Sequence, residues 1–164
     1  MKIKLFACCL GLFFLFFSPN ALPTEQEGRL GVGTSNQLIT NMPGLSVKLQ
    51  KSSSFAFGAV FAIDSDEMSG GYGAGVKLYK LLFDEPQLNF YSSLLAALIN
   101  QKYTKIIDKS GFQFDLTLGS EFHFSGLQSL GFSFEFGVSF NKIEDFKIQT
   151  VGHNFFSAGI HFYL

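Results

Sequence analysis

Large apolar side chains occupy every second position of residues 130–140, LGFSFEFGVSF. Four of these six side chains are phenylalanines, whereas the positions between them hold glycine, serine and one glutamate, Glu135. A period of two is the side-chain period of a β-strand. The stretch is therefore predicted to be a strand with one bulky apolar face and one face of small or polar residues.

Seven further segments have the same period: 29–35, 45–50, 54–63, 71–83, 88–100, 111–124 and 154–164. The least regular is 88–100, because Leu95, Ala97 and Ile99 place apolar side chains on its second face. A helix over SSLLAALIN, residues 92–100, is the alternative there, since short apolar runs are ambiguous. The pattern favours eight strands and an all-β chain.

The connections between these segments alternate in length. Three are short, at 51–53, 84–87 and 125–129, and four are longer and polar, at 36–44, 64–70, 101–110 and 142–153. Long and short connections alternate along the chain, which is typical of an up-and-down antiparallel sheet with tight turns at one edge and loops at the other. A sheet of eight such strands is predicted to close into a barrel.

The two faces of the strands indicate what surrounds this barrel. An eight-stranded barrel has an interior that side chains just fill, and the many Phe and Leu side chains would overfill it. Glycine and serine fit a narrow lumen, and the apolar face can then meet lipid. Apolar-out, polar-in strands of about ten residues are typical of membrane barrels, which must be closed because lipid tolerates no unpaired backbone edge. We therefore expect an eight-stranded antiparallel up-and-down transmembrane β-barrel.

The first 21 residues are predicted to be a secretory signal peptide. Lys2 and Lys4 precede a 13-residue apolar run at 5–17, and Ser18 to Ala21 follow it. That run is too short to span a bilayer, which takes about 20 residues, and has the order of a signal sequence. The barrel domain is then 22–164, and outer-membrane localisation in a Gram-negative bacterium is expected.

Cysteine and charge exclude several classes of function. Cys8 and Cys9 both lie in the predicted signal peptide, where a lipoprotein-type cleavage is the alternative, so residues 22–164 contain no disulfide or thiolate metal site. Removing Lys2 and Lys4 from the 12 basic residues leaves 10, against 13 acidic residues, a net charge of −3. No basic patch indicates nucleic-acid binding.

The complete pattern resembles the small eight-stranded outer-membrane barrels of the OmpA/OmpX type. The most specific part of the resemblance is the terminal segment FFSAGIHFYL, residues 155–164, which resembles the C-terminal strand that the barrel-assembly machinery recognises. The resemblance implies a monomer that contacts outer-membrane lipid and lipopolysaccharide.

The predicted lumen carries a set of charged and histidine side chains. Unpaired buried charges are costly, so we expect these residues to form ion pairs that plug the lumen; a proton or ion pathway is the alternative. An acid and a histidine two positions apart also form half of a catalytic triad, but no serine is singled out as a nucleophile. The predicted lumen polar network is Arg29, Lys48, Lys77, Asp115, Glu121, His123, Glu135 and His161.

Two other motifs have simpler interpretations. GGYGAGVK, residues 70–77, lacks the following helix of a phosphate-binding loop, and its glycines repeat with the period of a strand. Asp64, Asp66 and Glu67 lack the spacing of a calcium loop. They are interpreted as a solvated acidic loop, with divalent-cation bridging to lipopolysaccharide as the alternative. No catalytic residue, cofactor or metal site is predicted.

These observations predict an outer-membrane barrel with a plugged polar lumen and four surface loops, in a structural or surface-interaction role. The first alternative is a narrow porin-like channel, or an uptake route for small apolar molecules as in OmpW-like barrels. The second is a lipid A-modifying barrel enzyme, which requires a Ser/His/acid set that the sequence does not single out.

Overall fold

The computed structural model describes residues 28–164 except 41, 43, 86, 105 and 153–155. The predicted signal peptide, 1–21, lies outside the described residues. The described chain contains nine strands: β1 (Leu30–Ser35), β2 (Gly44–Gln50), β3 (Phe55–Asp64), β4 (Gly71–Glu85), β5 (Leu88–Lys102), β6 (Asp108–Phe124), β7 (Leu127–Lys142), β8 (Phe146–Thr150) and β9 (Ser157–Tyr163). No helix in this part of the chain is long and apolar enough to cross a membrane.

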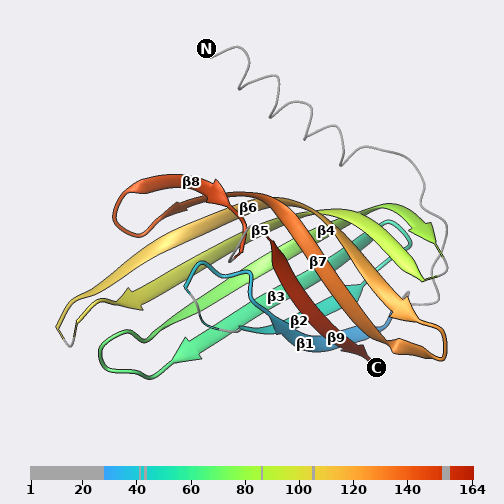
Figure 1. The fold of residues 1–164 in the computed structure, drawn as a ribbon, viewed down its shortest axis with the longest axis horizontal. Coiled ribbons are helices and arrows are strands. Elements are labelled where there is room, and N and C mark those ends of the chain that lie inside the picture. Colours follow the sequence, from blue (N-terminus) through green and yellow to red (C-terminus); the bar gives the residue numbers. More distant parts are fainter. Residues whose placement is uncertain (1–27, 41, 43, 86, 105, 153–155) are drawn as a thin grey trace, which may run out of the picture.

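Eight of the nine strands form a closed barrel (Figure 1). Strands β1 to β7 pair in sequence order, and β9 joins β7 to β1, with every pairing antiparallel. The all-β, eight-stranded up-and-down barrel predicted from the period-two pattern is confirmed. Residues 92–100 belong to β5, so the helix alternative for them is wrong.

The outer face of the barrel is apolar and the inner face is polar or small. In β3, Phe57 and Ile63 are 49% and 71% exposed, whereas the alternating Ala56 and Val60 are buried. In β7, Phe134 is exposed, and the neighbouring Glu135 is buried inside. The predicted direction of the two faces is therefore confirmed.

Two glycines face the lumen where larger residues would not fit. A Cβ atom added at Gly119 would lie 2.7 Å from the Tyr91 ring and the Glu135 side chain, and one at Gly131 would lie 2.7 Å from Glu121 Oε1. Both distances are shorter than van der Waals contact. Glycine on the polar face thus provides the volume that the lumen side chains fill.

The predicted short connections are present, but two are shorter than predicted: β4 ends at Glu85 and β5 begins at Leu88, and β6 ends at Phe124 and β7 begins at Leu127. Two predicted long loops also differ from the structure. Strands β5 and β6 pair as far as Lys102 and Asp108, so the connection is 103–107 rather than 101–110. The predicted loop 142–153 contains β8, which pairs with the end of β7 from Val138 to Lys142. The β8 sequence FKIQT does alternate, but its five residues are all exposed, so no buried face marks it as a strand.

Candidate functional site: the barrel lumen

Two buried ion pairs cross the lumen. The Nζ atom of Lys77 on β4 lies 2.5 Å from Oε1 of Glu135 on β7. The Nζ atom of Lys48 on β2 lies 2.5 Å from Oε2 of Glu121 on β6. All four side chains are almost fully buried. In each pair the lysine and the glutamate neutralise each other's charge, which is needed because an isolated charge in the interior would be very costly.

Hydroxyl groups complete the hydrogen bonding of both carboxylates. Glu135 accepts hydrogen bonds from Tyr91 Oη at 2.9 Å and Thr117 Oγ1 at 2.8 Å. The second carboxylate, Glu121, accepts one from Tyr163 Oη at 2.6 Å. A buried, ionised carboxylate is costly unless its oxygens also accept hydrogen bonds from nearby donors. The two tyrosines and the threonine supply these donors and are therefore part of the network.

Two tyrosine rings connect the ion pairs. Tyr79 and Tyr91 pack edge to face with ring centroids 5.3 Å apart. Lys48 Nζ lies 4.8 Å from the Tyr79 centroid and 5.0 Å from that of Tyr91, and Lys77 Nζ lies 4.8 Å from the Tyr79 centroid. These distances are within the range of cation–π attraction. The lumen is therefore filled by one continuous set of rings and charges.

The connection between β1 and β2 folds into the lumen at the loop edge. Gln37 accepts a hydrogen bond from Lys77 Nζ at 2.5 Å and donates one to Asp115 Oδ2 at 3.1 Å. Gln113 donates to the same Asp115 oxygen at 2.7 Å and to the Gln37 carbonyl oxygen at 3.0 Å. This connection was predicted as a loop at the edge of the barrel, but its buried glutamine closes the lumen above the ion pairs.

Apolar side chains of the same connection extend this closure. Leu38 and Met42 are buried in a cluster with Val60, Ala62, Leu95 and Ala97. The signal in the sequence is the presence of Leu38, Ile39 and Met42 in a connection that should otherwise be polar. We call the described residues 37–40 and 42 the plug segment.

Seven of the eight predicted network residues lie inside the barrel, and Arg29 does not join them. The Arg29 guanidinium lies at the short-turn edge, where its Nη2 donates to Ser129 Oγ and to the Tyr163 carbonyl oxygen, both at 2.8 Å. Arg29 precedes the first residue of β1, Leu30, so the alternation of side chains along the strand does not direct it into the lumen. The predicted network did not include the tyrosines, Gln37, Gln113 or Thr117, although the period-two pattern places most of them on the polar face.

The two histidines lie on either side of Glu121. His123 Nε2 is 3.9 Å from Glu121 Oε2, and His161 Nδ1 is 3.8 Å from Glu121 Oε1. The other ring nitrogen of His161, Nε2, lies 2.9 Å from Ser46 Oγ. Ser46, His161 and Glu121 thus occur in the order of a catalytic triad.

The geometry of these three residues does not support nucleophilic catalysis. A catalytic acid must hydrogen-bond the histidine that it orients, and 3.8 Å is too long. The two oxygens of Glu121 are already bonded to Lys48 and Tyr163. Ser46 itself is 2% exposed, which leaves no route for an ester substrate to reach its hydroxyl.

Outside the lumen, the acidic loop between β3 and β4 is held by its own backbone. Asp66 Oδ1 accepts hydrogen bonds from the amides of Met68 and Ser69, at 2.8 and 2.7 Å, which lower the pKa of this exposed carboxyl below its ordinary value. Within the described ranges, no group of three or more His, Cys, Asp or Glu side chains is arranged to hold a metal ion.

Comparison of the chain with protein-family models, with curated proteins and with solved structures finds no match. Because a barrel fold supports many functions, the function must be argued from the faces and the lumen of this chain.

Proposed function

We propose that this chain is a monomeric outer-membrane barrel of a Gram-negative bacterium, with a closed lumen and a structural or surface-interaction role. The observation that carries the proposal is the inverted polarity of the closed barrel, with phenylalanine and leucine outside and charged pairs inside. Lipid is the solvent that favours such a surface, because an apolar band of this kind exposed to water would aggregate.

The closed lumen favours this role over a channel or an uptake route. The plug segment fills the lumen at the loop edge, and the two ion pairs cross the lumen below it. Gln37, Leu38 and the four ion-pair side chains are all buried. A porin-like channel requires a water-filled lumen. The lipid A-modifying alternative is disfavoured by the inaccessible Ser46 and the misaligned Glu121.

The extended hairpins at the loop edge suit contact with other molecules. The tip of the β5–β6 hairpin carries Ile106, which is 93% exposed, and Phe146 and Ile148 of β8 are also exposed. An ion pair of Lys109 with Glu144 links the two hairpins and lowers the pKa of the Glu144 carboxyl. Both hairpins lie at the same end of the barrel (Figure 1), where they would face outward from the cell.

A topology experiment tests the membrane location. An epitope inserted after Asp66, in the β3–β4 loop, should be detected by antibody on intact cells. The same epitope inserted after Ser52, in the β2–β3 turn, should be detected only after the outer membrane is permeabilised. Equal labelling of the two insertions on intact cells would show that the edges do not lie on opposite sides of a membrane.

Conductance distinguishes a closed barrel from a channel. The refolded protein should give no steady ion current in a planar lipid bilayer, because the plug segment and the ion pairs exclude a continuous water column. The double variant Gln37→Ala/Leu38→Ala should give transient openings, since it removes the side-chain hydrogen bonds of Gln37 and the packing of Leu38 that hold the plug segment. Ile106→Ala, at an exposed tip, is the control and should stay silent. Steady current through the unmodified protein would favour the porin-like alternative.

A further inference from the structure

A lysine lies on the apolar outer wall with no anionic partner among the described residues. Lys80 of β4 pairs in register with Phe55 of β3, and its Nζ atom lies 4.5 Å from the centroid of the Phe55 ring. The side chain is 6% exposed, and among the described residues it makes no ion pair. A charge held on an apolar wall is costly unless an anion or water meets it.

A buried hydroxyl lies beside this lysine on the same wall. Ser92 of β5 is the register partner of Lys80, so both side chains point outward. Ser92 is 2% exposed, and its Oγ has no hydrogen-bond partner in the described part of the chain. Ser120 of β6 lies one diagonal step away, since it pairs with Phe90. In the described part of the chain, a cation without an anion and a hydroxyl without a hydrogen-bond partner therefore lie side by side on an apolar surface.

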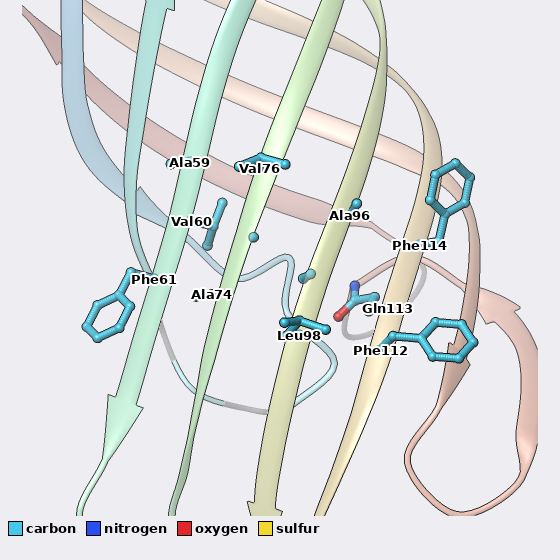
Figure 2. Close-up of a pocket in the computed structure, with 12 residues that line it drawn as sticks. Ala59, Val60, Phe61, Ala74, Val76, Ala96, Leu98, Phe112, Gln113 and Phe114 are labelled. Carbon is cyan, nitrogen blue, oxygen red and sulfur yellow. The ribbon is translucent and has the colours of Figure 1, made fainter.

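The same wall contains an apolar hollow nearer the loop edge (Figure 2). It has a volume of about 590 Å³ and spans β3 to β6. Its outward-facing lining has small side chains and Leu98 in the middle, with Phe61 on one side and Phe112 and Phe114 on the other. The small residues are Ala59, Ala74, Val76 and Ala96. Such a hollow fits a narrow apolar chain rather than a polar ligand.

The hollow and the polar pair are aligned along the same two strands. Lys80 follows Val76 by four residues on β4, and Ser92 precedes Ala96 by four residues on β5, a separation of roughly 13 Å along each strand. Leu78 and Leu94 lie between them and pair with each other. The hydrocarbon core of a bilayer is roughly 30 Å thick, so one leaflet accounts for about 15 Å. The distance between the hollow and the polar pair therefore fits within one leaflet, so a single lipid could place its headgroup at the polar pair and an acyl chain in the hollow.

We propose that this wall binds one phospholipid of the leaflet on the short-turn side. The lipid phosphate lies at Lys80, where the ammonium compensates its charge and the Ser92 hydroxyl donates to a phosphate oxygen. One acyl chain runs over Leu78 and Leu94 and ends in the hollow. The inference rests on the proposed function, because it requires the outer wall to face lipid.

Native mass spectrometry of the folded barrel in detergent tests this site with phosphatidylglycerol as the probe. We expect one phosphatidylglycerol to be retained per barrel. Lys80→Met keeps the apolar stem and removes the charge, and should weaken retention about tenfold; Lys51→Met, at an exposed turn position, is the matched control and should change nothing. Ala74→Phe fills the hollow and should weaken retention by a similar factor. Each variant is first checked for folding by its heat-dependent gel shift.

Two further probes separate the parts of the ligand. Diacylglycerol lacks the phosphate and glycerol phosphate lacks the chains, so neither should be retained. Equal retention of phosphatidylglycerol by the Lys80→Met variant would overturn the proposal, as would retention of glycerol phosphate alone. A barrel dimer that Ala74→Phe abolishes would show that a second copy occupies the hollow instead.

Failure of the site is distinguishable from failure of the proposed function. Insertion into lipid vesicles, measured by protection of the strands from added protease, tests the membrane location independently of any bound lipid. A barrel that inserts but retains no lipid overturns only the binding site. A barrel that does not insert overturns both.

Discussion

Glu135→Ala is expected to lower the free energy of unfolding by about 3–5 kcal/mol, the usual cost of removing one partner of a buried ion pair. The carboxylate accepts hydrogen bonds from Lys77, Tyr91 and Thr117, and its removal leaves the Lys77 ammonium buried without its ion-pair partner. Urea unfolding of the barrel in lipid vesicles, followed by the heat-dependent gel shift, measures the change.

A double variant separates the ion pair from the packing around it. Lys77→Met/Glu135→Leu replaces both charges by apolar groups of similar size, and should be closer in stability to the unmodified protein than either single variant. Glu144→Ala breaks the exposed pair with Lys109 and should leave the urea midpoint almost unchanged, because solvent screens exposed ion pairs. If Glu135→Ala leaves the urea midpoint unchanged, the carboxylate is not held by the lumen network.

The barrel could be predicted from the sequence because both of its requirements are local. A period of two fixes the strand and assigns each side chain to a face, and alternating connection lengths place successive strands beside one another. In β7, the phenylalanines could be assigned to one face and Glu135 to the other before any contact was known. The same reasoning placed Lys48, Lys77 and Glu121 in the lumen.

The partners inside the lumen could not be predicted in the same way. Which lysine meets Glu135 depends on the register and tilt of strands that are distant in the sequence, and Lys48, Lys77 and Arg29 were equally good candidates. The structure brings Lys77 to Glu135 and Lys48 to Glu121. The inward fold of Gln37 and Leu38 was missed because a connection has no periodicity that indicates its direction.

Lys80 shows a different limit of the period-two pattern. Alternation places it on the apolar wall opposite Ser92, but the register shift between Leu81 and Phe83 interrupts the alternation just beyond it. From the sequence alone, a lysine at this point would be interpreted as a solvent-exposed residue at the end of a strand. Only the pairing with Phe55 and the low exposure of Lys80 show that its side chain is covered on the apolar wall.

The assignment of the outer face to lipid can be tested at two adjacent positions of β7. Phe134 is 46% exposed on the outer wall near the middle of the strand. Phe134→Arg should destabilise the barrel in vesicles by about 2–4 kcal/mol, the range for a cation at mid-bilayer depth on the lipid face. Phe134→Leu should change stability little, because lipid adapts to the new side chain as a packed core cannot.

The neighbouring Ser133 should show the opposite tolerance. Its side chain faces the lumen, where it is 6% exposed and pairs with Gly159 and Glu121 on either side. A Cβ atom at Gly159 would already lie 2.7 Å from Ser133 Oγ, so Ser133→Phe has no space and should prevent the folded gel band from forming. Ser133→Ala is the control for loss of the hydroxyl alone and should fold. If position 134 accepts arginine in vesicles while position 133 accepts phenylalanine, the apolar face does not meet lipid, and the proposed membrane location is wrong.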